Sequence, residues 1–170
     1  MTASARTTIV APVPEAEAAV ASWRARFDPW AQLGVPAHIT LLTPFLPVEL
    51  IDGAVIDRMR SIWTRRSVLP VVLSQVAQIP GAIALLPEDA TPLEGLTAEL
   101  LAEWPELRPQ VRTGFARPYH ITIACRDDRA LLAQLSEELA PKLPLRADLG
   151  SLLVFGASED GEVRVLARIR

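Results

Sequence analysis

Two short segments of the chain repeat one pattern of chemically active residues. His38-Ile39-Thr40 and His120-Ile121-Thr122 contain both histidines of the sequence, and a proline lies two positions before each histidine. Successive side chains of an extended strand point to opposite faces. Each histidine therefore shares a face with its threonine, and the intervening isoleucine points toward apolar packing. We expect each strand to project an imidazole and a hydroxyl together.

This pattern suits acid–base chemistry at phosphorus. In-line displacement requires a base on the attacking oxygen and an acid on the leaving oxygen, and histidine serves in either role near neutral pH. Two threonine hydroxyls would hold the non-bridging phosphoryl oxygens as charge develops on them. The two copies indicate an internal duplication, and a pseudo-twofold relation would make the two pairs face each other.

Two other interpretations of the motifs compete with catalysis. A single His-x-Thr on a strand is more often a structural polar segment, but a matched pair that uses every histidine favours function. A metal site shared with a carboxylate is the second alternative. No acidic residue accompanies either motif, and the chain has no cysteine pair for a conventional zinc site. We therefore expect metal-independent chemistry without a cofactor.

The longer segments Pro-Ala-His-Ile-Thr-Leu-Leu-Thr-Pro-Phe at 36–45 and Pro-Tyr-His-Ile-Thr-Ile-Ala at 118–124 resemble the two-histidine (2H) phosphoesterase superfamily. This superfamily includes 2′-5′ RNA ligase-like proteins and 2′,3′-cyclic nucleotide phosphodiesterases. The resemblance implies a bilobal, duplicated α+β fold in which two antiparallel sheets line a central cleft and helices lie outside.

The same resemblance implies roles for four residues. His38 and His120 would be the acid–base pair, and Thr40 and Thr122 would bind phosphate. The implied reaction is hydrolysis of a 2′,3′-cyclic or 2′-linked phosphodiester in a small nucleotide or RNA terminus. RNA end-joining in the ligase direction and a non-catalytic nucleotide-binding module remain as alternatives.

Four further residues are candidates for substrate binding. Many relatives carry a basic residue five positions after the second histidine, where this chain has Cys125, so Arg126 could serve only if the strand ends there. Arg117, in the loop before the second motif, could supply positive charge, although a solvated arginine is the alternative. Tyr119 and Phe45 flank the motifs and could stack on a base; core packing is their alternative role.

Composition limits the class of partner. The 170 residues are 50% hydrophobic, which predicts one two-lobed domain over residues 1–170 with a sizeable core. A net charge of −3 argues against a long nucleic-acid groove. No targeting segment or membrane-spanning run is evident, so we expect a cytoplasmic monomer that acts on a small nucleotide or RNA terminus. The single cysteine, Cys125, is expected to be a small buried hydrophobic residue.

Strands and helices are expected to alternate along the chain, with hairpins among them. This pattern favours an α+β fold over a doubly wound parallel sheet. Apolar periodicity and proline positions predict helices at 14–27, 48–65, 92–104 and 127–139. Strands are predicted at 7–13, 38–43, 68–79, 82–86, 120–125, 149–155 and 163–169.

Overall fold

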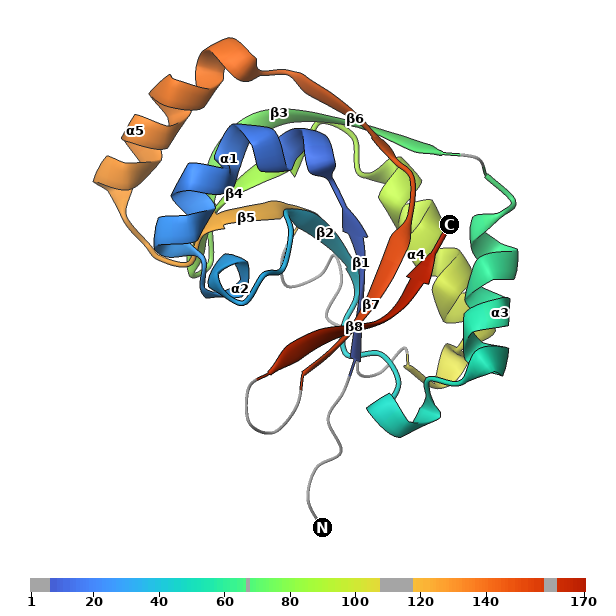
Figure 1. The fold of residues 1–170 in the computed structure, drawn as a ribbon. Coiled ribbons are helices and arrows are strands. Elements are labelled where there is room, and N and C mark those ends of the chain that lie inside the picture. Colours follow the sequence, from blue (N-terminus) through green and yellow to red (C-terminus); the bar gives the residue numbers. More distant parts are fainter. Residues whose placement is uncertain (1–6, 67, 108–117, 158–161) are drawn as a thin grey trace.

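The computed structural model describes residues 7–66, 68–107, 118–157 and 162–170. Over these ranges the chain forms two four-stranded antiparallel sheets, with strand orders β2-β1-β7-β8 and β5-β4-β3-β6 (Figure 1). The strands are β1 (Thr7–Pro12), β2 (His38–Leu42), β3 (Leu69–Ile79), β4 (Ala82–Pro87), β5 (Ile121–Ala124), β6 (Leu145–Leu149), β7 (Leu152–Ala157) and β8 (Val163–Ile169). The helices are α1 (Pro14–Phe27), α2 (Pro29–Gln32), α3 (Gly53–Trp63), α4 (Thr91–Glu103) and α5 (Arg129–Leu139), with short 3₁₀ segments η1 (Val48–Leu50), η2 (Pro105–Leu107) and η3 (Ala140–Lys142).

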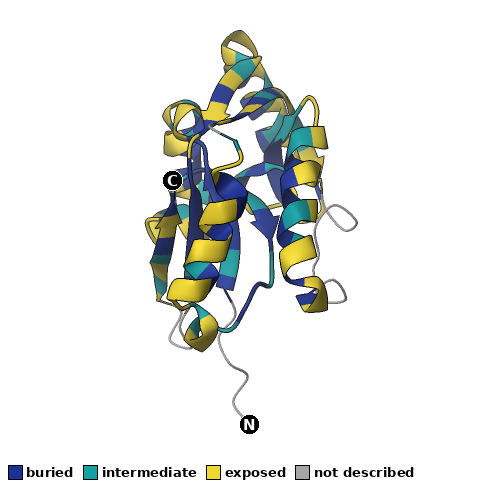
Figure 2. Cartoon of the chain, turned by 90° about the vertical axis from the view of Figure 1, so that its right-hand side faces the viewer, coloured by how far each residue is buried: buried dark blue, intermediate teal, exposed yellow. Residues whose placement is uncertain are grey.

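Each sheet is covered by a pair of helices. Helices α3 and α4 contact each other, and they contact β8 and β2 of the first sheet. Helix α1 contacts β5 and β6, and α5 contacts β3, so these two helices lie against the second sheet (Figure 1). The helices turn apolar faces inward and leave exposed faces on the outside (Figure 2).

The order of elements repeats within the chain. The succession β1-α1-β2-α3 is followed later by β4-α4-β5-α5. In the first copy, α1 leaves the first sheet and packs on the second; in the other copy, α4 leaves the second sheet and contacts β2 of the first. The strands that carry the two motifs, β2 and β5, are the equivalent edge strands of the two sheets. This repeat agrees with the internal duplication inferred from the paired motifs.

Local sequence explains where several elements begin and end. The Asp52 carboxylate accepts a hydrogen bond from the Val55 N–H, and the Asp128 carboxylate accepts one from the Leu131 N–H. These bonds satisfy N–H groups that have no partner within the helix, so α3 and α5 start directly after each aspartate. The predicted helix 48–65 is therefore divided, with η1 before Asp52 and α3 after it.

The α+β class and the bilobal pair of antiparallel sheets are confirmed. One strand was missed: β6 shows the alternation Leu145, Ala147, Leu149 that is typical of a strand, and β7 begins only at Leu152. The expectation of a buried Cys125 was wrong, because β5 ends at Ala124 and the cysteine is exposed.

Candidate active site

Strand geometry separates the polar from the apolar residues of the first motif. Ile39 and Leu41 are fully buried, whereas His38 and Thr40 are half-buried. The second motif has the same alternation: Ile121 and Ile123 are fully buried, and Thr122 is half-buried. The predicted projection of an imidazole and a hydroxyl from one face of each strand therefore matches the burial pattern.

The two imidazoles make the same hydrogen bond to their own backbone. Nδ1 of His38 lies 2.8 Å from the Pro36 carbonyl oxygen, and Nδ1 of His120 lies 2.6 Å from the Pro118 carbonyl oxygen. A carbonyl oxygen only accepts, so Nδ1 must carry the proton in each bond. Because Nδ1 is occupied by this bond, Nε2 is the nitrogen of each ring that remains to exchange protons with a substrate.

The edge strands bring the two motifs together. Strands β2 and β5 contact each other although they belong to different sheets. Burial lowers the pKa of His38 below its ordinary value of 6.5, and the hydrogen bond to the Pro36 carbonyl opposes this effect. The charges of Arg24 and His120 lower this pKa further, and Asp28 raises it. A positive charge on His120 disfavours a second positive charge on His38, as expected of two imidazoles that lie near each other.

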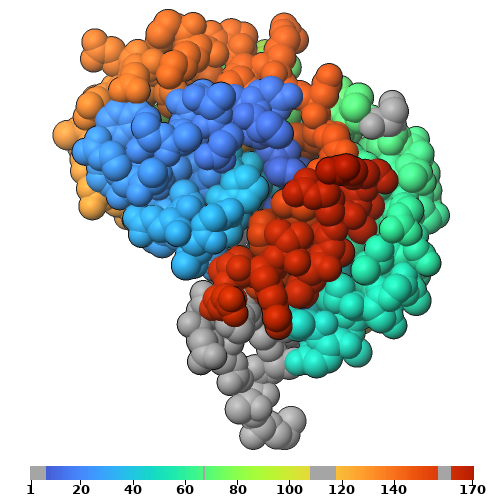
Figure 3. All heavy atoms as spheres, in the orientation of Figure 1, coloured from blue at the N-terminus to red at the C-terminus, as the bar shows by residue number. Residues whose placement is uncertain are grey.

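The first sheet supplies further side chains to the face that carries Thr40. Its registers pair Thr40 with Val10, Val10 with Leu153, and Leu153 with Arg168. Directly paired residues of an antiparallel sheet point to the same face. Arg168, which is exposed, therefore lies on the face of Thr40, on the opposite edge strand β8. Figure 3 shows this C-terminal strand at the molecular surface.

An aromatic ring from β7 lies beside the first histidine. The ring centroids of His38 and Phe155 are 6.5 Å apart, with the planes tilted by 45°. Phe155 is half-buried, and the residue paired with it on β8, Val165, is 48% exposed. Sequence reasoning placed Phe155 in a strand but gave it no role, because its proximity to His38 arises only from sheet pairing.

The two predicted stacking residues lie in the core. Phe45 is fully buried and packs edge-on against Trp104, with centroids 5.1 Å apart. Tyr119 is buried, and its hydroxyl donates to the Thr97 hydroxyl at 2.9 Å. Neither ring presents a face on which a base could stack, so the structure corrects both assignments in favour of core packing.

The two predicted arginines have different outcomes. Strand β5 ends before Arg126, as a binding role would require, but its guanidinium lies 4.9 Å from the Phe27 ring centroid and 3.9 Å from the Asp128 carboxylate. These contacts place the Arg126 side chain against the end of α1 and beside the residue that caps α5. Arg117 lies outside the described residues.

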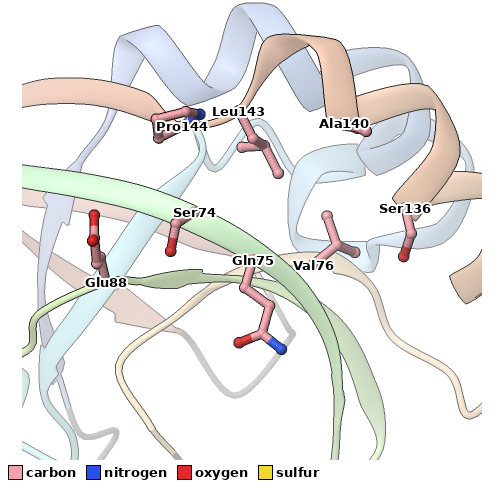
Figure 4. A pocket seen from close by; sticks show the side chains of 8 residues that line it. All are labelled: Ser74, Gln75, Val76, Glu88, Ser136, Ala140, Leu143 and Pro144. Carbon is pink, nitrogen blue, oxygen red and sulfur yellow. The ribbon is translucent and has the colours of Figure 1, made fainter.

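Convergent metal ligands and a cavity are two further features that can mark a functional site. In the described part of the chain, no three histidine, cysteine, aspartate or glutamate side chains converge on a point where a metal ion could bind. A cavity of about 490 Å³ lies between β3 and the segment that follows α5 (Figure 4). No residue of either motif lines it, and it is therefore separate from the candidate active site. Its lining residues are Ser74, Gln75, Val76, Glu88, Ser136, Ala140, Leu143 and Pro144.

Comparisons with known proteins agree with this architecture. Residues 12–161 match the family model described as the 2′-5′ RNA ligase superfamily. The fold is similar to that of Escherichia coli LigT complexed with 3′-AMP, with a TM-score of 0.56 and 17% identity over 98% of this chain and 97% of that chain. A crystal structure described as a phosphoesterase gives a TM-score of 0.53 with 17% identity, again over 98% and 97% of the two chains. No curated protein matches the sequence.

Among the described residues, no helix is long and apolar enough to cross a membrane.

Proposed function

The chain belongs to the 2′-5′ RNA ligase superfamily, and we propose that it is a metal-independent phosphodiesterase. Its substrate would be a 2′,3′-cyclic or 2′-linked phosphodiester in a small nucleotide or at an RNA terminus. The observation that carries this proposal is the pair of Pro-x-His-x-Thr segments on contacting edge strands, each with Nδ1 bonded to its own proline carbonyl.

In the proposed reaction, water attacks the phosphorus atom of the cyclic diester. Nε2 of His38 takes the proton of the attacking water, and the imidazolium of His120 protonates the ribose oxygen as its bond to phosphorus breaks. The lowered pKa of His38 supports this division of roles, because a base must be neutral at working pH. The hydroxyls of Thr40 and Thr122 would donate to the non-bridging oxygens as negative charge accumulates on them.

Side chains of the first sheet support a nucleotide as the bound group. The Phe155 ring beside His38 offers an apolar surface for a base or ribose. Arg168 supplies positive charge on the same sheet face as Thr40, three strands away, so it would contact a phosphate other than the one attacked. The 3′-AMP held by the structurally similar LigT is consistent with a nucleotide ligand here.

A substrate panel tests the proposal. Wild type, His38→Ala and His120→Ala would be assayed on 2′,3′-cyclic nucleotides, 2′-5′ dinucleotides and ADP-ribose cyclic phosphate, with and without EDTA. We expect EDTA-resistant hydrolysis, and we expect each substitution to lower kcat by on the order of 10²-fold or more. The exposed α3 variant Arg60→Gln serves as the control and should retain wild-type activity.

The outcomes separate the remaining alternatives. Loss of activity on chelation would contradict the metal-independent mechanism. Nucleotide binding without turnover would identify a binding module instead of an enzyme. Joining of RNA ends without hydrolysis would assign the ligase direction.

A further inference from the structure

An ionic cluster with a buried centre and a partly exposed member, Glu17, lies beside the backbone that leads into the first motif, and the proposed chemistry does not use it directly. Arg24, near the end of α1, and Asp28, directly after that helix, have side chains that are each only 1% exposed. Arg24 donates to the Asp28 carboxylate from Nε and Nη2, at 3.0 and 2.8 Å, and from Nη1 to Glu17 at 2.9 Å. Burial of two charges is costly, so this cluster must be held by its hydrogen bonds.

The cluster holds the backbone that leads into the first motif. Nη2 of Arg24 donates to the Val35 carbonyl at 3.0 Å. The Glu17 carboxylate accepts a hydrogen bond from the N–H of Ala37, the residue just before His38. The carbonyl of Ala37 accepts from the Val13 N–H at 2.8 Å. The peptide groups on both sides of Ala37 are thus bonded to the N-terminal part of α1, so the start of β2 has little freedom to shift.

The C-terminal end of α1 holds the strand that carries the second motif. The Phe27 carbonyl accepts a hydrogen bond from the Cys125 N–H at 2.8 Å, directly after β5. The Asp28 Oδ1 atom accepts from the Cys125 thiol at 3.7 Å and from the Trp30 N–H at 3.0 Å. Helix α1 therefore bonds the start of β2 through its N-terminal part and the end of β5 through its C-terminal end.

We propose that Arg24, Asp28 and Glu17 are positioning residues that fix the separation and alignment of the two His-x-Thr strands. This inference rests on the proposed function for its catalytic consequence, although its structural part does not depend on it. None of the three residues is assigned contact with the substrate. Errors of about 1 Å in the placement of reacting groups cost about 10²-fold in rate, so the effect should appear in kcat more than in KM.

Three variants separate positioning from ordinary stabilisation. Arg24→Lys keeps the charge but cannot bond Asp28, Glu17 and Val35 together, because an ammonium lacks the planar fork of a guanidinium. The double variant Arg24→Met with Asp28→Leu removes both buried charges and should fold, since apolar replacement of a buried pair is often neutral. Arg26→Met, on the same helix, removes an exposed arginine that stacks on Phe27 and serves as the matched control.

We expect Arg24→Lys and the double variant to lower kcat about 10- to 100-fold with little change in KM, and we expect Arg26→Met to match wild type. Wild-type kcat in the folded double variant would overturn the proposal, because it would show that the cluster only stabilises the fold. If the double variant does not fold, Arg24→Lys decides: a folded Arg24→Lys protein with wild-type kcat would overturn the proposal as well.

A second readout does not depend on activity. The chain contains only two histidines, so each imidazole can be followed by NMR and assigned with His38→Ala and His120→Ala. The charged groups that act on His38 are Arg24, Asp28 and His120. Arg24→Met should raise the pKa of His38 and Asp28→Asn should lower it, whereas Arg26→Met should leave it unchanged. An unchanged His38 titration in the first two variants would contradict the placement of the cluster even if no substrate is found.

Discussion

At the scale of single residues, the candidate site is defined by how each imidazole is held. In both motifs the acceptor of the Nδ1 proton is the carbonyl oxygen of the proline two positions earlier. The proline ring restricts the backbone angle φ there, which limits where this carbonyl oxygen can lie. Each ring is therefore oriented within its own pentapeptide. A role for both histidines in proton transfer requires such fixed tautomers, because only one nitrogen of each ring then exchanges protons with the substrate.

The lowered pKa of His38 leads to a pH prediction. A base must be unprotonated, and a group whose pKa is lowered stays unprotonated to lower pH. We expect the acid limb of the kcat/KM profile to lie below pH 6.5, so that activity is lost only as pH falls through the lowered pKa of His38. A pH–rate profile on a 2′,3′-cyclic nucleotide measures this. An acid limb at or above 6.5 would show that His38 is not the base.

The threonines lead to a second prediction. Thr40→Val and Thr122→Val keep side-chain shape but remove the hydroxyl that would stabilise the phosphoryl oxygens. Loss of one such donor costs about 10²- to 10³-fold in kcat in related electrostatic sites, and we expect kcat to fall by about 10²-fold in each variant. Thr40→Ser and Thr122→Ser should retain most activity. Thr64→Val, at the exposed end of α3, is the control. An equal loss of kcat in Thr64→Val would argue against phosphate binding by Thr40 and Thr122.

Sequence reasoning found the four motif residues because chain spacing alone defines them. It assigned no role to Phe155 or Arg24, since their relation to His38 depends on strand pairing and on helix packing between distant segments. The same limit explains the error at Phe45 and Tyr119. Their burial depends on Trp104 and Thr97, which lie on or beside α4 and cannot be paired with them by sequence spacing.

At the scale of elements, each predicted long segment has the helix or strand type that the sequence indicates. The helices α3 and α5 begin later than predicted, directly after their N-cap aspartates. The missed strand β6 follows η3 closely and is only five residues long, so its alternation was short and adjoined the helical pattern of α5. The sequence predicted the contact between β2 and β5 only through the inferred duplication, because neither strand alone indicates it. This contact depends on the exchange of α1 and α4 between the two sheets.

The cap of α5 gives a prediction at this scale. Asp128→Ala removes the carboxylate that accepts from the Leu131 N–H at 3.0 Å. We expect the free energy of unfolding to fall by about 1 kcal/mol, measured by denaturant titration, because loss of an N-cap typically has this cost. The kcat at 25 °C should not change, since the Asp128 carboxylate contacts Leu131 and Arg126 and the proposed reaction uses neither. Asp57→Ala, whose carboxylate is exposed on α3, should change stability by less than about 0.5 kcal/mol. A comparable loss in both variants would argue against the cap.

At the scale of the whole molecule, the duplication explains why one site needs both halves of the chain. Each half supplies one His-Thr pair on an edge strand, and each half sends its first helix across to the other sheet. Separation of the halves would therefore remove one of the two covering helices from each sheet as well as the partner imidazole. In the proposed site the four reacting side chains lie at the junction of two edge strands, which is a small area for a ligand.

Net charge and this small area together predict a limited footprint on RNA. The chain has a net charge of −3, and Arg168 is a cation that sheet pairing places on the face of Thr40. We expect kcat/KM for oligonucleotides that end in a 2′,3′-cyclic phosphate to stop rising beyond about three nucleotides. Each phosphate contact to a single strand contributes about −0.7 to the slope of log affinity against log salt, so one or two contacts predict a slope between about −0.7 and −1.4. Arg168→Gln should reduce that slope by about 0.7 and leave cleavage of mononucleotide 2′,3′-cyclic phosphates unchanged, because these lack a second phosphate. A steeper slope, or affinity that keeps rising to ten nucleotides, would reveal a longer binding surface than the two edge strands provide.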